Sequence, residues 1–291
     1  MTEVTSVPAA SWDQVFASAE QERALGALES GSVVLLPQLR FPLREDEEQL
    51  LSPSIAGDSK NVSLDPARGA VRGSLAAPAQ LELLQSMMLR FAASSATLTR
   101  NLFPRYAAGL RRGRASFRPI EIEGRSTSWR KDDTRLHVDS FPSSPTRGAR
   151  ILRVFSNINP DARVRTWRLG EPFETVVQGH RRALSGPVPG VSYLLERLGI
   201  TKGRRSPYDH VMLRLHDRMK ADLRYQSQAA QSVHEFHAGC TWIVFTDQVS
   251  HAAMAGQYAL EQTFLVPLEC MQDPSLAPLR ILERVLGREL A

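Results

Sequence analysis

Apolar residues recur at helical spacing in the first half of the chain and at strand spacing in the second half. The strongest helical pattern covers residues 77–110, where apolar side chains return every three, four or seven positions, at Leu81, Leu84, Met88, Phe91, Leu98 and Leu102. A stripe with this period covers one face of an amphipathic helix. Because Pro104 falls inside the segment, we expect one or two helices there, packed against a sheet.

The rest of the N-terminal region gives shorter signals. Residues 12–28 predict a helix that ends near Gly31, and the apolar run at 33–37 predicts a strand. The acidic run at 45–48 is typical of a solvated helix face. Turn-forming residues dominate positions 61–73, so we expect a loop there.

From Phe117 onward the apolar pattern shortens towards the two-residue period of β-strands. The predicted strands cover residues 117–123, 136–138, 150–157, 164–169, 175–177, 241–245 and 257–266. A helical insert interrupts them at about 179–236, with one helix at 189–198 and another at 208–225. The second helix carries a face of residues four apart, namely Val211, Leu215, Met219 and Leu223. A short surface helix is predicted at 279–290.

Many short strands with Gly and Pro between them are typical of a sandwich or barrel. We therefore expect a mainly β fold with flanking helices (α+β) in one domain spanning residues 1–291. In this scheme an N-terminal helical and loop region (1–116) packs on a β core (117–267) that contains the insert. Residues 268–291 form a C-terminal helix.

The charge comes almost wholly from arginine, with 32 Arg and 4 Lys and a net charge of +5. Arginine binds carboxylates and phosphates in a bidentate manner, so an anionic substrate or an anionic membrane surface is expected. We expect no nucleic acid partner, because no aromatic stripe alternates with the basic residues. Two cysteines indicate neither a disulfide framework nor a zinc site. Without a signal peptide or a run of about 20 apolar residues, the chain is expected to be cytoplasmic.

His137 and Asp139 are two residues apart in a segment predicted to be extended. Residues i and i+2 of a strand point to the same face, so these two side chains would project together. His251 follows the buried strand predicted at 241–245 and is a third possible ligand. Two histidines and one carboxylate form the facial triad that binds Fe(II) and leaves one side of the ion open. The alternative is that these are structural, hydrogen-bonded residues, because His-x-Asp is a weak signal by itself.

Three longer segments resemble the 3-deoxy-D-manno-oct-2-ulosonic acid (Kdo) hydroxylase family. They are residues 129–139 (WRKDDTRLHVD), 150–160 (RILRVFSNINP) and 241–254 (TWIVFTDQVSHAAM). The resemblance covers about residues 117–267, and residues 61–73 also resemble the family's pattern. It implies a double-stranded β-helix, or jelly-roll, core with His137, Asp139 and His251 as iron ligands. It further implies that Fe(II), 2-oxoglutarate and O2 are used to hydroxylate C3 of Kdo in a lipopolysaccharide precursor, Kdo–lipid A, with succinate and CO2 as co-products.

The distal carboxylate of 2-oxoglutarate needs a cationic anchor. Many related enzymes carry a basic residue just before a Tyr on the strand after the second His, but this chain has Gln257 there. The anchor is therefore expected on the strand after His-x-Asp, at Arg150 or Arg153. These two are three apart and face opposite sides of a regular strand. Arg153 is slightly favoured, and the alternative is that both are surface charges.

Four further residues are candidates for binding the substrate. Trp129, Arg130 and Lys131 directly precede the ligands and could line the mouth of the site. Arg165 could belong to an anion-binding lip or face solvent. Contact with the inner face of the inner membrane would fit a lipid-linked substrate. Two other functions remain open on the residues alone, a cupin-like metalloenzyme with non-redox sugar chemistry and a non-catalytic jelly-roll carbohydrate-binding module.

Overall fold

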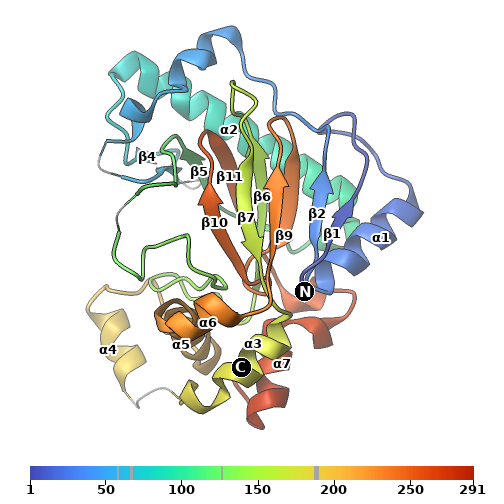
Figure 1. Cartoon of the computed structure of the whole chain (residues 1–291), viewed down its shortest axis with the longest axis vertical. Coiled ribbons are helices and arrows are strands. Elements are labelled where there is room, and N and C mark those ends of the chain that lie inside the picture. The colour runs from blue at the N-terminus through green and yellow to red at the C-terminus, as the bar shows by residue number, and fades with distance from the viewer. Residues whose placement is uncertain (58, 66–67, 126, 187–189) are drawn as a thin grey trace.

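The computed structural model describes residues 1–291 except 58, 66–67, 126 and 187–189, and two β-sheets form its centre (Figure 1). The larger sheet has the strand order β1 (Val4–Ser6), β2 (Val33–Leu36), β9 (Thr241–Phe245), β6 (Arg150–Asn157), β11 (Ala259–Val266), β5 (Arg111–Arg118), β3 (Val62–Leu64) and β4 (Val71–Arg72). The smaller sheet has the order β10 (His251–Ala255), β7 (Arg165–Leu169) and β8 (Ser232–Phe236). All of these pairs are antiparallel except β1 with β2. The fold is therefore mixed α/β with two largely antiparallel sheets.

An aromatic cluster joins the two sheets. Phe155 of β6 meets Trp167 of β7 edge to face, with ring centroids 5.1 Å apart. Trp242 of β9 stacks on Phe155 and, at 4.1 Å, on Phe236 of β8. All four rings are buried, so they hold the sheets face to face and leave the polar residues further along β6 and β7 to line the space between them.

Helices cover the outer surface of the larger sheet. α2 (Pro78–Leu102) packs on β5, β3 and β11, and its buried face includes Leu84, Met88, Phe91 and Leu98. α1 (Ser18–Glu29) packs on β2 and β9. The period of the apolar stripe predicted one or two helices here, and the structure has one, α2, which ends just before Pro104.

A second helical layer lies at one end of the sheets (Figure 1). It contains α3 (Phe173–His180), α4 (Val191–Arg197), α5 (Pro207–Ala221), α6 (Leu223–Gln228) and α7 (Pro278–Leu286). α3, α5 and α7 share one apolar core. Short 3-10 turns complete the chain at Glu45–Leu50, Pro53–Ala56, Pro104–Tyr106, Arg181–Ala183, Leu268–Cys270 and Pro274–Leu276. No helix in the described ranges is both long and apolar enough to cross a bilayer.

Several predicted elements were wrong. Residues 175–177 lie in α3, where Pro172 precedes the first turn, and not in a strand. The strand predicted at 117–123 runs earlier, as β5, and the loop predicted at 61–73 contains β3 and β4. The strands β8 and β10 were not predicted, and β8 falls within the expected helical insert.

The predicted helices also differ in detail. The acidic run is a 3-10 turn whose Glu47 is buried against Arg90. Leu223 is exposed on α6, outside the buried face of α5. α7 buries Leu279 and Leu282 and is not a surface helix. Of the helix predicted at 189–198, Pro189 lies outside the described residues.

Candidate metal centre

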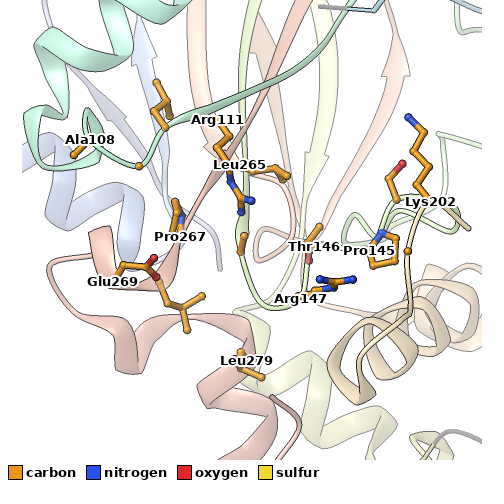
Figure 2. Close-up of a pocket in the computed structure, with 16 residues that line it drawn as sticks. Ala108, Arg111, Pro145, Thr146, Arg147, Lys202, Leu265, Pro267, Glu269 and Leu279 are labelled. Carbon is orange, nitrogen blue, oxygen red and sulfur yellow. The ribbon is translucent and has the colours of Figure 1, made fainter. Parts of the chain in front are cut away.

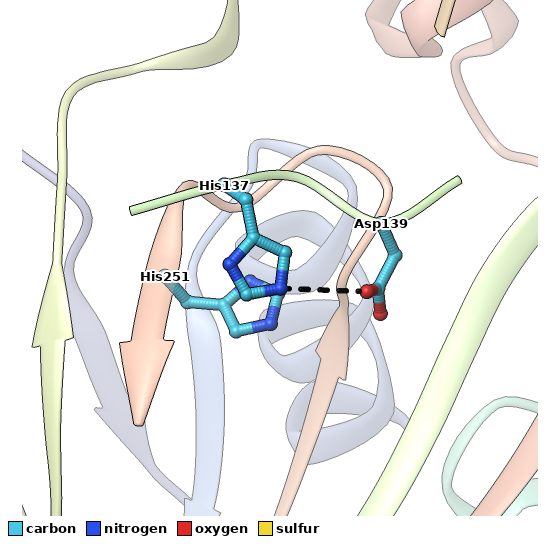
Figure 3. A group of neighbouring side chains, drawn as sticks. All are labelled: His137, Asp139 and His251. Atoms are coloured by element: carbon cyan, nitrogen blue, oxygen red, sulfur yellow. Dashed lines mark ion pairs between the residues drawn. The ribbon is translucent and has the colours of Figure 1, made fainter. Parts of the chain in front are cut away.

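His137 and His251 are direct neighbours across a short antiparallel bridge. The His137 N–H donates to the His251 carbonyl at 3.0 Å, and the His251 N–H donates back at 2.9 Å. Asp139 lies two residues further along, and its N–H donates to the Thr246 carbonyl at 2.7 Å. The three side chains converge, with their ligand atoms all within 4.8 Å of one another (Figure 3). His137 Nε2 and Asp139 Oδ1 are 3.8 Å apart.

Backbone carbonyls fix both imidazole rings. His137 Nδ1 lies 2.7 Å from the Arg135 carbonyl, and His251 Nδ1 lies 2.8 Å from the Val249 carbonyl. Because a carbonyl only accepts, each Nδ1 must carry the proton, and each Nε2 keeps a lone pair. Burial is the main cause that lowers the pKa of both histidines, so they stay neutral near pH 7. This is the protonation state that a metal ligand requires.

The carboxylate of Asp139 is held ionised by Arg153. Arg153 Nη2 lies 2.9 Å from Asp139 Oδ2, and Arg153 Nη1 donates to Glu261 Oε1 at 2.8 Å. Burial alone would raise the pKa of Asp139, but the charge of Arg153, followed by the two histidines, lowers it below the usual value. Glu261 also accepts from Arg118 Nε at 2.9 Å. A largely buried Arg118–Glu261–Arg153 network therefore supports the third ligand.

The donor set suits a divalent iron ion. It offers two imidazole nitrogens and one carboxylate, and the described residues contain no other such group of three. A six-coordinate ion held by these three residues would keep three positions for other ligands. Both the protonation states and the arrangement of the donors thus fit an iron centre.

The triad lies in the wall of a cavity of about 730 Å³. Ten of its lining residues are basic and four are acidic; the basic ones are Lys60, Arg112, Arg114, Arg118, Arg130, Lys131, Arg153, Arg165, Lys202 and Lys220. This excess of positive charge over Asp65, Asp133, Asp139 and Glu261 favours anionic ligands.

Arg165 is the most unusual of these cations. It is buried on the inward face of β7 together with Trp167, whose ring stacks on His251 with centroids 5.0 Å apart. Its Nη1 donates to the Gly256 carbonyl at 3.2 Å, whereas Nε has no hydrogen-bond partner. Within the described part of the chain Arg165 forms no ion pair. Burial, and after it the charge of Arg118, lowers the pKa of Arg165 to about 9, so the side chain still carries its charge at neutral pH.

Two residues proposed for the co-substrate do not reach the cavity. Arg150 is fully buried on the opposite face of β6, where it pairs with Asp247 at 2.9 Å. The Gln257 side chain donates to the Pro119 carbonyl at 2.8 Å and does not line the cavity. The prediction that Arg150 and Arg153 face opposite sides is confirmed, but neither is a surface charge.

The residues predicted at the mouth divide into two groups. Arg130 and Lys131 line the cavity, as does Arg165. Trp129 lies instead in a separate pocket beside α5, where the Arg130 guanidinium covers its ring at 4.1 Å.

Sequence reasoning missed several residues of the site. Arg118 and Glu261 were not predicted as site residues, although a glutamate inside the apolar run at 257–266 is a usable signal of a buried charge. His216 of α5 lies edge-on to His137 at 5.4 Å. Lys220 donates to the Arg130 carbonyl at 3.0 Å and so fixes the loop that precedes the ligands.

A second cavity of about 990 Å³ adjoins the first (Figure 2). The two share Ser144, Pro145, Lys202 and Leu265 as lining residues. Much of the wall of the second cavity is apolar, and three cations, Arg111, Arg147 and Lys202, also line it. The second cavity, which adjoins the cavity of the triad, is therefore lined by both apolar and cationic groups.

Two sheets enclosing a buried 2-His-1-carboxylate site beside a cationic cavity define the class of non-haem iron oxygenases. Comparison with known proteins agrees. The sequence profile of the 3-deoxy-D-manno-oct-2-ulosonic acid (Kdo) hydroxylase family matches residues 11–289. This chain belongs to that family, and it is an Fe(II)/α-ketoglutarate-dependent dioxygenase.

Solved structures of a relative are similar to this structure over nearly the full length of both chains. The Kdo hydroxylase KdoO in complex with α-ketoglutarate and Fe(III) is 47% identical, with a TM-score of 0.96, covering 100% of this chain and 98% of that one. Its complex with cobalt(II) is 48% identical, with a TM-score of 0.96, over 99% and 97% of the two chains. Its complex with succinate and Fe(III) has 48% identity and a TM-score of 0.95 over the same shares. A comparison with curated protein sequences found no match. Membership of this family excludes the two alternative functions, non-redox sugar chemistry and carbohydrate binding without catalysis.

Proposed function

We propose that this enzyme hydroxylates C3 of the Kdo sugar in a lipopolysaccharide precursor, Kdo–lipid A, and gives the 3-hydroxy sugar with succinate and CO2. The observation that carries the proposal is the convergence of His137, Asp139 and His251 in the wall of a cavity with six more basic than acidic residues, ten against four. Kdo carries a carboxylate and lipid A carries phosphates, and guanidinium groups bind both. Synthesis of such a precursor at the cytoplasmic leaflet fits a cytoplasmic enzyme.

The finer architecture we infer is a double-stranded β-helix. In it, β5, β11, β6 and β9 form one wall, and the segment around His137 with β10, β7 and β8 forms the other. The strand orders and the bridge between His137 and His251 support this assignment. We treat the whole chain as one domain.

His137, Asp139 and His251 would hold Fe(II). When bound, Fe(II) with 2-oxoglutarate and O2 supplies the oxidising chemistry, in which decarboxylation of the co-substrate to succinate accompanies insertion of one oxygen atom into a C–H bond. The protein keeps both histidines neutral and aims each Nε2 through a carbonyl at Nδ1. Arg153 fixes the orientation of Asp139.

We assign the anchor for the distal carboxylate of 2-oxoglutarate to Arg165 in preference to Arg153. Arg153 already lies between two carboxylates, whereas Arg165 is a buried cation without an ion-pair partner among the described residues. An uncompensated buried charge is costly, and a bound carboxylate would compensate it. Arg165 lies two residues, roughly 7 Å, along β7 from Trp167, which stacks on His251. This separation suits a ligand that reaches from the metal to the guanidinium.

We assign substrate binding to the cations at the mouth, Arg130 and Lys131. Lys131 forms no ion pair in the described part of the chain, and Arg130 pairs only loosely with Asp217, at 3.4 Å. Both can therefore turn towards the carboxylate of a sugar acid.

The test is product analysis with Kdo–lipid A, Fe(II) and 2-oxoglutarate in air. The expected result is one added oxygen atom on the Kdo unit and one succinate for each hydroxylated sugar. Asp139→Ala should abolish both products, whereas Gln257→Ala, outside the cavity, should retain them. Succinate formation without any oxidised sugar would contradict the proposed substrate.

A further inference from the structure

The surface segment from Val191 to Ile200, which we name the α4 patch, consists of α4 and the turn that follows it. Its exposed large apolar side chains are Val191, Tyr193, Leu194, Leu198 and Ile200. These are five of the eleven such side chains in the described part of the chain, gathered within ten residues. Single exposed apolar residues are ordinary on protein surfaces, but a contiguous group indicates an interaction site.

The α4 patch has the geometry of a docking face. Val191, Leu194 and Leu198 follow the i, i+3, i+7 spacing that places residues on one side of a helix. Leu194 is 56% exposed and Leu198 is 63% exposed. α4 lies at the outer edge of the helical layer, so this side is open to an external surface (Figure 1).

Three cations without an ion-pair partner among the described residues lie within the α4 patch or directly after it in the sequence. Arg197, Lys202 and Arg204 are exposed, and in the described ranges none of them forms an ion pair. Glu196 is the single acidic residue of α4. Exposed aliphatic groups flanked by Lys and Arg are typical of segments that lie in the interface of an anionic bilayer.

The chain reaches the active site directly after the α4 patch. Lys202 follows Ile200 by two residues and lines both the cavity of the triad and the cavity of Figure 2. Its backbone N–H donates to the carbonyl of Ser143, another lining residue of the triad cavity, at 2.9 Å. A lipid surface against the α4 patch would therefore lie close to the entrance of the site.

We propose that the α4 patch docks the enzyme on an anionic lipid surface, so that a lipid-linked sugar enters the cavity past Lys202. The identity of the substrate rests on the proposed function, whereas the docking itself does not need turnover. Leu194 and Leu198 supply the apolar contact, and the neighbouring cations supply the attraction to the headgroups.

Vesicle co-sedimentation tests the docking. The full-length protein is mixed with vesicles of phosphatidylcholine and phosphatidylglycerol, or of phosphatidylcholine alone, and the double variant Leu194→Ser/Leu198→Ser is compared with Val15→Ser. Val15 is 83% exposed and precedes α1, so it controls for the loss of a surface apolar group. We expect preferential binding to the anionic vesicles, weakened about tenfold or more in the double variant and unchanged in Val15→Ser.

Three results would overturn the proposal. They are no vesicle binding by the wild type, equal binding by the double variant, and a dimer of the wild type that is lost in the double variant without any effect on vesicle binding.

Hydroxylation of soluble Kdo is measured separately, to distinguish failure of the docking from failure of the proposed function. If the proposed function fails, wild-type protein oxidises neither soluble nor lipid-linked sugar, yet its vesicle binding is unaffected. If only the docking fails, soluble sugar is still oxidised and the double variant oxidises lipid-linked sugar as fast as the wild type.

Discussion

Replacing Arg165 with methionine should change ligand affinity and stability in opposite directions. In the ligand-free protein Arg165 is a buried cation whose only described hydrogen bond goes to the Gly256 carbonyl. Methionine fills similar space without charge. Replacing a buried ion pair with apolar groups of similar volume is often neutral or stabilises proteins by about 1–4 kcal/mol, and we expect a gain of the same order for an unpaired buried cation. Loss of the bond to Gly256 offsets about 1 kcal/mol, which leaves roughly 0–3 kcal/mol in favour of the variant.

The same substitution should weaken binding of 2-oxoglutarate. Truncating one partner of a buried charge pair costs about 2–5 kcal/mol. That energy corresponds to a roughly 30- to 5,000-fold higher dissociation constant. The variant is therefore expected to be more stable without ligand and less able to bind the co-substrate.

Thermal unfolding with Fe(II) under anaerobic conditions measures both effects. At 100 times its dissociation constant, 2-oxoglutarate should stabilise the wild type by about 2.7 kcal/mol, or by roughly 5–10 °C for a chain of this size. Arg165→Met should start at an equal or higher melting temperature and, at the same 2-oxoglutarate concentration, show about a third of the wild-type shift or less. An unchanged affinity, or a ligand-free variant that is much less stable, would show that Arg165 has a structural role and is not the anchor.

Three other substitutions probe the surrounding charges. Arg150→Met should destabilise the protein by about 3–5 kcal/mol, because it leaves Asp247 buried and unpaired. The affinity for 2-oxoglutarate should stay unchanged. Reduced affinity in the folded variant would refute the conclusion that Arg150 does not bind the co-substrate. Glu261→Gln should reduce the fall in stability that occurs on acidification below about pH 4.5, because it removes the contribution of one carboxylate. The folded-state pKa of Glu261 is lowered: burial raises it, but the charge of Arg118 and then that of Arg153 outweigh burial. Its contribution is fully present above the unfolded pKa and is lost as the pH falls, and denaturant unfolding of both proteins from pH 7 to pH 3 checks the difference. Lys131→Ala should raise KM for the sugar substrate about 3- to 10-fold, as expected for an exposed charge, without affecting 2-oxoglutarate affinity. An equal loss of affinity for both ligands would contradict its role at the mouth.

The sequence predicted the metal ligands better than the walls around them. The period of two placed His137 beside Asp139, and the apolar run at 241–245 indicated that His251 follows a buried strand. Both inferences depend only on backbone geometry and burial. The resemblance to a known family then turned a weak pattern into a specific expectation.

The cavity walls were harder to predict because a site for anions puts charged residues on strand faces that are apolar elsewhere. β5 contains four arginines and one glycine among its eight residues, so its apolar signal is weak, and it was placed too late in the chain. Arg165 shares an inward face with Trp167, which the alternation along β7 makes evident once the strand is known. Residues 175–177 were predicted as a strand because β-branched residues favour strands. They lie in a helix because the packing of α3 against α5 and α7 decides the structure.

The central claim is that His137, Asp139 and His251 bind one Fe(II) that also accepts 2-oxoglutarate. The most direct measurement is an anaerobic titration of the metal-free protein with Fe(II) and 2-oxoglutarate, followed by visible absorption. The account predicts a charge-transfer band that saturates at one iron per chain in the wild type and is absent in His251→Ala. A band of undiminished strength in that variant, or none in the wild type, would contradict the account.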